Sequence, residues 1–389
     1  MKVTFDKNAL VAALIPATGI VPNRNTNSAM EGLLFECPGD LEGTCRLSAY
    51  DMEKGMRTSL PARITEPGKC ILNAQSLLQI ARSLPDGGIT IEIDDRFRAR
   101  ITGGNSSFEI GARPGEDFPS MPILSGDRYY VMPQHRLRTL ITGVLFAVAQ
   151  NDQRPAFNGA FLHIHDGILT LVGCDGNRLA IGNMPAPGGE NAPKAEMIVP
   201  GRMLSEVFKL LKDSEDDVTL MLTRKHVIFV VGEICFFTRI IDVDYIDYTR
   251  YIPKDYLTGV FLDTASLRGA IERASLITEN KLGSNARTFV KMEFDGAEVR
   301  ISSVSDGGSV RETVPAAIEG NGVVIGFNCR FMLDILRACP DEMETLHLRL
   351  NSEYMGMTIE NGTSKDPDAA PSEEPEFTFF VMPVKMDMR

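Results

Sequence analysis

Few side chains in this sequence are spaced for chemistry, and the best candidates lie within one short stretch. His163 and His165 are two residues apart, so on a strand both imidazoles would share one face and could chelate a metal ion. Two ligands do not complete a metal site, and a solvated strand face is the simpler interpretation of the pair. Cys174 beside Asp175 could act as a nucleophile, but no histidine is placed along the sequence to activate the thiol. We therefore expect Cys174 to be an inert, buried thiol at the end of a strand.

No other stretch carries a stronger catalytic or metal-binding pattern. Glu215, Asp216 and Asp217 are most simply a solvated turn, because no partner residues for a metal ion can be identified. The phosphate-binding G-x-x-x-x-G-K-[ST], the dinucleotide-binding G-x-G-x-x-G and the zinc-binding H-E-x-x-H are all absent. We expect a protein that is not an enzyme and that uses neither a metal nor a cofactor.

The candidate residues belong to a pattern that occurs three times. Residues 157–180 predict a strand, a tight Asp166-Gly167 turn, a second strand and a loop. Altered copies begin at Gly32 and Phe289, so the pattern returns at about one third of the chain length, roughly every 128 residues. Repetition at this period predicts three similar domains. We place these domains at 1–125, 126–253 and 254–389.

Each third is predicted to contain two amphipathic helices and a series of strands. In the third copy Asp263 is placed to cap the helix, and five apolar residues fall near the spacing of one buried helical face. They are Leu267, Ala270, Ile271, Ala274 and Leu276. The pattern predicts an α+β fold in which two helices per domain pack on one face of an antiparallel sheet. The helices are expected at 6–19, 73–84, 133–150, 200–212, 263–281 and 328–339.

Length and composition are those of an ordinary globular protein. The chain has 389 residues, 43% hydrophobic and 24% charged, and no apolar run approaches the roughly 20 residues that span a bilayer. Seven cysteines without a C-x-x-C pair fit reduced thiols, so we expect a cytoplasmic location and no membrane association. Segments 113–128 and 244–259 are expected to join the thirds, and the acidic segment 361–376 is expected to be a loop.

Charge is distributed unevenly between the helices and the rest of the chain. The net charge is −12, yet the six helix segments, with the fourth counted over 200–213, together carry about +5, which leaves about −17 elsewhere. If the helices line one surface, that surface would hold phosphates through salt-sensitive contacts that are independent of base sequence. It has neither aromatic side chains placed to stack on bases nor a recognition helix, which favours loosely held duplex DNA. The basic residues expected there are Arg24, Arg82, Arg136, Arg138, Arg202, Lys209, Lys212, Arg268, Arg273 and Lys281.

Seven short motifs follow one another along the whole chain. They are MKVTFDKNAL at the start, GEDFPSMP at 115–122, RPAFNGAFLHI at 154–164, CDGNRLA at 174–180, VDYIDYTRYIP at 243–253, GFNCRFMLDIL at 326–336 and the terminal FFVMPVK. Together with the three-fold repeat, these motifs resemble the bacterial DNA polymerase III β subunit, the replicative sliding clamp. The resemblance implies a head-to-tail homodimer, a ring of six domains whose helices line a hole around double-stranded DNA. The implied function is that of a processivity factor.

The resemblance also implies partners and DNA contacts. The partners would be the DNA polymerase III α subunit, the clamp loader and other proteins that carry clamp-binding peptides. Arg24, Arg82 and Arg202 match basic positions of the family that face DNA, and Asn151 matches a polar position that contacts DNA.

Partner proteins of these clamps insert a short peptide into an apolar pocket between the second and third domains. Here Met, Pro, Val, Leu and Phe side chains would form an adaptable groove, with Arg178, Arg250 and Lys385 as a charged rim. The matching positions are Phe157, Cys174, Gly176, Asn177, Arg178, Leu179, Ile246, Arg250, Tyr251, Met382, Pro383, Val384 and Lys385.

Several positions depart from the usual family motifs. The family commonly reads T-D-G-H-R-L where this chain has Cys174 and Asn177, and F-P-D-Y where it has 245–248. An aromatic pair beyond Asn151 is replaced by residues 155–156, a Pro-Ala pair. These differences lead to the hypothesis of a divergent clamp with an altered partner preference. The alternatives are a repeat-built protein-interaction scaffold that does not encircle DNA, and an enzyme that uses Cys174 or the histidine pair.

Overall fold

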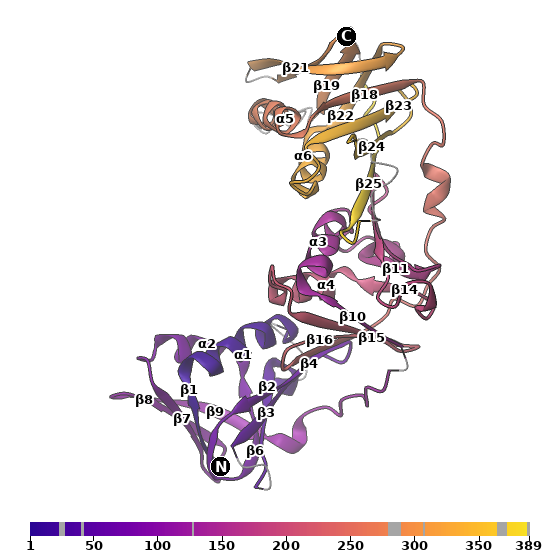
Figure 1. Cartoon of the computed structure of the whole chain (residues 1–389). Coiled ribbons are helices and arrows are strands. Elements are labelled where there is room, and N and C mark those ends of the chain that lie inside the picture. Colours follow the sequence, from indigo (N-terminus) through magenta and orange to yellow (C-terminus); the bar gives the residue numbers. More distant parts are fainter. Residues whose placement is uncertain are drawn as a thin grey trace. The chain divides into compact units, whose positions relative to one another are not determined.

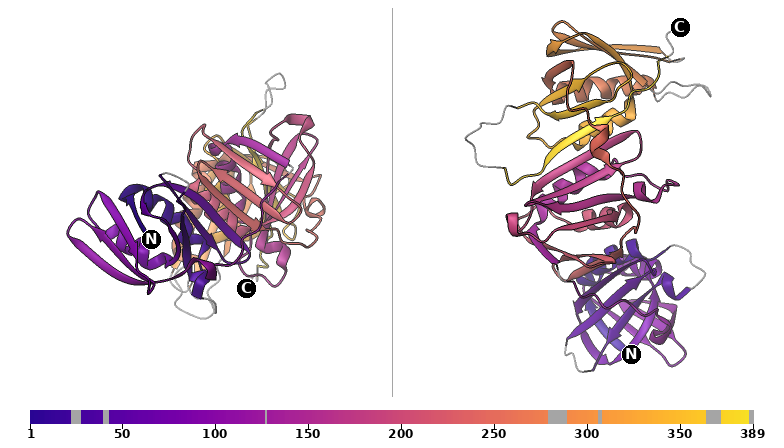
Figure 2. Two further views of the ribbon diagram at one scale, coloured as in Figure 1. Left: turned by 90° about the horizontal axis from the view of Figure 1, so that it is seen from below. Right: turned by 90° about the vertical axis from the view of Figure 1, so that its right-hand side faces the viewer.

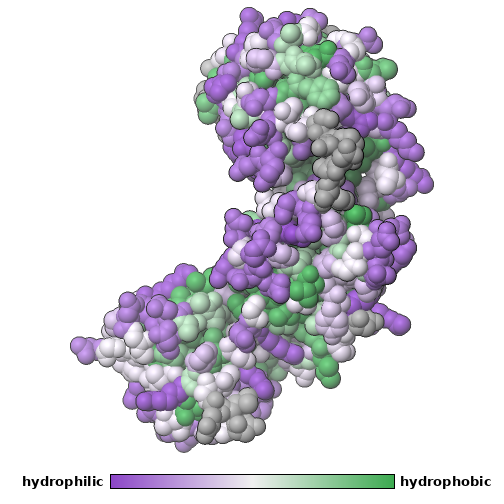
Figure 3. Space-filling model, in the orientation of Figure 1, coloured by the Kyte–Doolittle hydropathy of each residue, from purple (hydrophilic) through white to green (hydrophobic). Residues whose placement is uncertain are grey.

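The computed structural model describes residues 1–22, 28–39, 43–126, 128–278, 289–305, 308–363 and 372–386. They form two compact units, one of Met1–His135 with Arg202–Ile240 and one of Arg136–Gly201 with Ile241–Arg389 (Figures 1 and 2). Each unit is built on one antiparallel sheet that runs from one repeat into the next. The middle repeat is therefore divided between the two units. Figure 3 shows hydrophilic side chains interspersed with hydrophobic ones on the visible face.

The first unit contains a 13-stranded sheet. Helices α1 (Lys7–Ile20) and α2 (Ala74–Ser83) pack against each other, and α1 also lies against β3 and β4; α4 (Gly201–Leu210) belongs almost wholly to this unit. The strands in sheet order are β10 (Arg128–Pro133), β15 (Asp217–Leu222), β16 (His226–Val231), β17 (Ile234–Arg239), β4 (Lys54–Pro61), β3 (Thr44–Tyr50), β2 (Gly32–Cys37), β6 (Gly68–Asn73), β9 (Ser106–Pro114), β8 (Arg98–Gly103), β7 (Gly88–Ile93), β1 (Lys2–Asp6) and β5 (Arg63–Glu66).

The second unit contains a 12-stranded sheet. Helices α5 (Thr264–Thr278) and α6 (Cys329–Ala338) pack against each other, and nearly all of α3 (Gln134–Leu145) belongs to this unit. The strands in sheet order are β14 (Ala195–Pro200), β11 (Gly159–His165), β12 (Ile168–Cys174), β13 (Arg178–Pro185), β25 (Glu376–Val381), β24 (Met357–Asn361), β23 (Thr345–Leu350), β18 (Thr258–Asp263), β21 (Gly308–Gly320), β20 (Glu298–Ser305), β19 (Phe289–Asp295) and β22 (Val323–Asn328).

The six predicted helices are all present, and side-chain caps explain where several of them begin. Asp6 and Asn73 accept hydrogen bonds from the backbone N–H groups of Ala9 and Ser76, at 3.0 and 2.9 Å. Asp263 accepts one from Ser266 at 2.6 Å, as its predicted capping role requires. Of the five apolar residues predicted for the buried face of α5, four are fully buried, but Leu276 is 66% exposed, so its prediction was wrong. Leu276 lies five residues after Ile271, which at 3.6 residues per turn carries it away from the buried face. The α+β prediction with two helices in each repeat is confirmed.

The third helix is shorter than the predicted 133–150, because it ends at Leu145. The next residues turn tightly, with Ala147 bonded to Val144, and the N–H of Ala149 then donates to the carbonyl of Phe157 at 2.8 Å. A helix that continued to residue 150 would need that N–H for its own ladder. Lys281, at the predicted end of α5, lies outside the described residues.

Each repeat has more strands than the sequence pattern indicated. Every one of the six described helices follows directly after a strand, and the first two repeats close with a further strand, β9 or β17. The third repeat closes with β25, in the apolar segment near the C-terminus. The alternation in β9 is weak because most of its side chains are exposed, and its last two residues fall in the segment expected to be a linker. These closing strands matter because two of them carry a sheet from one repeat into its neighbour.

The two strand pairings that join neighbouring repeats, β17 with β4 and β25 with β13, have the same register. β17 pairs with β4 so that Phe236 faces Met56, and β25 pairs with β13 so that Phe379 faces Ala180. Met56 and Ala180 are equivalent, because each follows the residue that closes a four-residue connection between neighbouring strands. The same strand-pairing register therefore joins the first repeat to the second and the second to the third.

Candidate functional site

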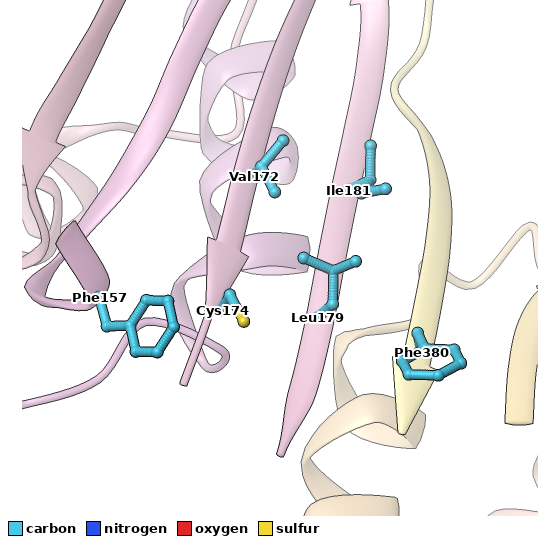
Figure 4. Close-up of a cluster of buried hydrophobic side chains, with 6 residues drawn as sticks. All are labelled: Phe157, Val172, Cys174, Leu179, Ile181 and Phe380. Carbon is cyan, nitrogen blue, oxygen red and sulfur yellow. The ribbon is translucent and has the colours of Figure 1, made fainter. Parts of the chain in front are cut away.

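The predicted partner site is centred on a small apolar cluster in the second unit. Phe157 comes from the 3-10 turn Pro155–Asn158, Cys174 ends β12, Leu179 lies in β13 and Phe380 lies in β25. Val172 and Ile181 complete the cluster, and all six side chains are buried. Figure 4 shows Cys174 between the Phe157 ring and Leu179. The pairing of β13 with β25 is what brings residues of the second and third repeats together here.

The segment that follows the second repeat packs against this cluster. The rings of Phe161 and Tyr245 stack at 5.0 Å, and the Tyr245 hydroxyl donates to the carbonyl of Val172 at 3.3 Å. Burial raises the pKa of Tyr245, so its hydroxyl stays protonated and available as a donor. His163 is hydrogen-bonded to the Tyr248 hydroxyl at 3.0 Å. These contacts hold the segment that carries Ile246, which packs on the cluster as the sequence analysis placed it.

The loop between β12 and β13 is a tight, self-bonded turn. The Asp175 carboxylate accepts hydrogen bonds from the N–H groups of Asn177 and Arg178, at 2.9 and 3.0 Å. Gly176 has a φ of +90°, a conformation that favours glycine, and its N–H donates to the Cys174 sulfur. Burial raises the pKa of Cys174, which keeps it a neutral thiol. These features match the expectation of an unreactive cysteine.

Arg178 is a buried anchor and not part of an exposed rim. Its side chain is 10% exposed, and its guanidinium bonds Asp175 at 3.0 Å, Asp334 at 2.5 Å and the carbonyl of Phe146 at 2.8 Å. The same group stacks over the ring of Phe331 at 4.7 Å. Arg178 therefore ties the loop to α6 of the third repeat, which corrects the expectation that it supplies a free charge.

The C-terminal segment completes the arrangement. The N–H of Met382 donates to the carbonyl of Asn177 at 2.8 Å, and the N–H of Val384 donates to Gly326. Pro383 lies between these two anchored residues and is half-buried. Met382 is 42% exposed beside the loop, and Lys385 is exposed.

Arg250 and Tyr251 form an exposed part of the same region. Tyr251 is 58% exposed, and Arg250 is exposed while pairing with Asp247 at 2.7 Å. The structure thus places Phe157, Cys174 and Leu179 as a buried floor. Arg250 and Tyr251 lie between Tyr248 and Ile252, which pack on this cluster, and they are exposed, as are Met382 and Lys385.

Several residues near the site were missed by the sequence analysis. Phe331 and Asp334 hold Arg178 from α6, where their spacing of three places them on one helical face. Tyr354 and Met355 are strongly exposed on the β23–β24 connection. They precede Gly356, where an added Cβ would lie within 2.2 Å of the Phe380 ring. An exposed aromatic residue beside a methionine in a short turn was the signal that could have found them.

The predicted DNA contacts are spread over both units. Arg82 lies exposed in the last turn of α2, and Arg202 lies exposed in the first turn of α4. Asn151 is exposed and has a φ of +62°, a conformation that asparagine tolerates better than most residues. Arg24 lies outside the described residues.

Acidic neighbours neutralise part of the helical charge that the sequence analysis counted. Arg273 forms a two-pronged pair with Glu312, both contacts being 2.8 Å. Arg136 pairs with Glu373 and Glu374, and Lys209 pairs with Glu206 at 2.8 Å. Glu206 was already part of the charge count, but Glu312, Glu373 and Glu374 lie outside the helix segments and compensate part of their net positive charge.

The histidine pair has partners of its own. His165 pairs with Glu196 at 2.6 Å, and burial lowers the pKa of His163, with the neighbouring His165 adding to the effect. Among the described residues, no group of three or more His, Cys, Asp or Glu side chains is arranged to hold a metal ion. In that same part of the chain no helix is long and apolar enough to cross a membrane.

Three domain models of one family match the chain in order. They describe the N-terminal, central and C-terminal domains of the DNA polymerase III beta subunit, and they match residues 1–122, 131–247 and 249–369. The beta sliding clamp of Staphylococcus epidermidis is 26% identical over 99% of both chains. That of Pseudomonas putida is 29% identical over 90% of this chain and 93% of its own length.

Solved structures show the same likeness. A putative DNA polymerase III beta subunit from Eubacterium rectale has a TM-score of 0.88 and 26% identity over 99% of this chain and 100% of its own. The sliding clamp from Bacillus subtilis has a TM-score of 0.89 and 24% identity over 100% of both chains.

Proposed function

Because the chain belongs to the DNA polymerase III β subunit family, the bacterial sliding clamps, we propose that it encircles duplex DNA and tethers proteins to it. In this role it is a processivity factor and catalyses no reaction. The observation that carries the proposal is the sheet register shared by both inter-repeat crossings, because it leaves one equivalent pair of strand edges for a second copy. The domains are proposed at 1–125, 126–253 and 254–389, and the location as cytoplasmic.

The strand edges left for a second copy belong to β9 and β21. Among the described residues, β9 pairs with β8 along 106–111 and with β6 only at 112–114. In the same way β21 pairs with β20 along 308–315 and with β18 only at 316–320. Each strand thus offers one edge of backbone N–H and C=O groups, which is a template for pairing. β9 is the counterpart of β17 and β25, and β21 is the counterpart of β4 and β13.

The shared register predicts which side chains meet. Phe108 holds the position of Phe236, since each is in the third residue pair after its hairpin turn. Val310 is proposed as the counterpart of Met56: it is the second residue after Gly308, which pairs with Ser305 to close the β20–β21 connection, and Met56 is the first after Gly55. We therefore place Phe108 opposite Val310 of a second copy. Phe108 is 37% exposed in the single chain, as expected for a side chain that a partner covers.

Two such contacts would close a head-to-tail homodimer of six repeats. Arg24, Arg82, Asn151 and Arg202 are proposed to contact the phosphates of the enclosed duplex. Contacts of this kind hold the backbone without reading bases, so the ring remains free to slide.

The apolar cluster and its exposed surroundings are proposed to bind a short peptide of a partner protein. Apolar side chains of the peptide would lie over Leu179 and Met382, whose flexible thioether adapts to different shapes. Arg250 and Lys385, both exposed, would attract its acidic groups. The proposed partners are the DNA polymerase III α subunit, the clamp loader and other proteins with clamp-binding peptides. The unusual Cys174, Asn177 and Ile246 support an altered preference among such peptides.

Retention on circular DNA tests the ring directly. The protein would be loaded onto nicked plasmid circles by its clamp loader with ATP, and bound and free protein would be separated by gel filtration. We expect retention on circles and release once a restriction enzyme cuts them, because a ring slides off free ends. Equal retention before and after cutting would instead support a scaffold that does not encircle DNA.

A further inference from the structure

Two buried cysteines of the first unit face each other across neighbouring strands. Cys37 ends β2 and Cys45 lies in β3, one step beyond the paired residues Glu36 and Arg46. The two sulfur atoms are 2.9 Å apart, and both side chains are fully buried. Directly opposed residues of antiparallel strands have Cα atoms about 4.5–5.5 Å apart, within the 4.4–6.8 Å that a disulfide accepts. The strand pairing and the short distance between the two sulfur atoms are therefore compatible with a disulfide.

The environments of the two thiols differ and favour Cys37 as the nucleophile and Cys45 as the proton donor. Their shared hydrogen bond lowers the pKa of Cys37, and the nearby N-terminal ammonium group lowers it further, although burial acts in the opposite direction. The same bond and burial raise the pKa of Cys45. Thiolate character, the property that makes a cysteine reactive toward oxidants, is thus favoured at Cys37.

A third cysteine lies close by but is less suited to react. Cys70 is in β6, where it faces Phe35, and burial raises its pKa to about 12. No hydrogen bond is formed between its sulfur and either of the other two among the described residues. Cys70 therefore serves as an internal reference for a buried thiol in the same sheet.

We propose that Cys37 and Cys45 are a reversible modification site, a dithiol that hydrogen peroxide converts to a disulfide between β2 and β3. The Cys37 thiolate attacks one peroxide oxygen, the O–O bond breaks, and hydroxide leaves and takes up a proton as water. The Cys45 sulfur then attacks the Cys37 sulfenic acid, the S–S bond forms and the S–O bond breaks. The departing hydroxide takes the proton of Cys45 and leaves as a second water. Two thiols and one peroxide thus give one disulfide and two waters.

Burial makes the site selective for small oxidants. Peroxide is about the size of the water molecules that enter during local openings of a hairpin, whereas glutathione disulfide is far larger. Cys235 is only half-buried, so a bulky disulfide should reach it first. The product would link two strands of the first repeat and would be reversed by a dithiol reductant.

Mass mapping of the wild-type protein tests the proposal without any substitution. The reduced protein would be treated with hydrogen peroxide, alkylated, digested without reductant and examined for linked peptides. We expect a linked peptide joining Cys37 to Cys45, a loss of two hydrogens from that pair, and recovery of both thiols with dithiothreitol. Oxidation that reaches Cys235 or Cys70 while 37 and 45 stay alkylatable would overturn the proposal.

Two variants sharpen the assignment. Cys45→Ser should block the link and leave Cys37 as an over-oxidised acid, whereas Cys70→Ser should leave the link intact. Circular dichroism would show that each variant is folded. A link that forms between Cys37 and Cys70 in the wild type would assign the wrong partner and refute the proposed pair.

Discussion

The guanidinium of Arg178 lies 2.5 Å from the carboxylate of Asp334, although 156 residues separate them in the sequence. Arg178 also bonds Asp175 within its own loop and stacks on Phe331 of α6. The loop that carries Cys174 and Leu179 is therefore held in place by the third repeat. The proposed partner site would therefore depend on a contact that is itself buried.

Asp334→Asn should weaken the partner site more than the fold. The change removes one carboxylate from a largely buried arginine and should lower the free energy of unfolding by about 1–3 kcal/mol. The loop would lose its anchor, and we expect affinity for a clamp-binding peptide to fall at least tenfold. Isothermal titration of wild type and variant measures this, with Glu342→Gln as an exposed control. Unchanged affinity in a destabilised protein would show that Arg178 does not position the site.

Phe108→Arg should separate the proposed dimer. The substitution places a charge opposite Val310 of the second copy, in a position that pairing would bury. Light scattering should report a mass near the 42.7 kDa of one chain, where the wild type gives twice that value. Ile123→Arg, at another strongly exposed apolar residue, should leave the dimer intact. A Phe108 variant that remains dimeric would contradict the register.

Arg82→Ala and Arg202→Ala should weaken DNA retention without changing peptide binding. Each lost phosphate contact should reduce the slope of log affinity against log salt by about 0.9. The slope would be measured on duplex DNA at several salt concentrations. Arg300→Ala provides the control, because that guanidinium is already paired with three carboxylates. Slopes equal to that of the control would exclude both residues from the DNA contact.

His163 should make stability depend on pH. Burial lowers its pKa in the folded protein, and the groups facing it are His165, Glu196 and Tyr248. The folded state then binds fewer protons than the unfolded state just below pH 6.5, the ordinary histidine value. The stabilisation is present above pH 6.5 and is lost as the pH falls toward the folded pKa.

His163→Gln should flatten this part of the pH profile. Thermal unfolding of wild type and variant between pH 5 and 8 gives the comparison, and the difference cancels the contribution of other histidines. Identical slopes below pH 6.5 would show that His163 has an ordinary pKa.

Local patterns predicted the helices well and the long-range contacts poorly. The apolar face of α5 and the cap at Asp263 are properties of neighbouring residues, so the sequence predicts them directly. The pairing of Arg178 with Asp334 and that of Arg273 with Glu312 depend on which elements meet in space. A motif comparison placed Arg178 at the site but could not tell that its charge is already satisfied. The sequence pattern did not indicate β9, because a strand whose side chains are mostly exposed has little hydrophobic alternation to detect.

The middle repeat is divided between two sheets, so the boundaries of the sequence repeats and those of the sheets do not coincide. The sequence pattern repeats three times, yet β15, β16 and β17 share a sheet with the first repeat, and β11, β12 and β13 share one with the third. Amide exchange in the middle segment should therefore fall into two classes, each following its own sheet. Excised alone, the middle segment would lose the strand neighbours β4 and β25. The middle repeat is thus one unit in the sequence, but its two parts are expected to unfold with different sheets.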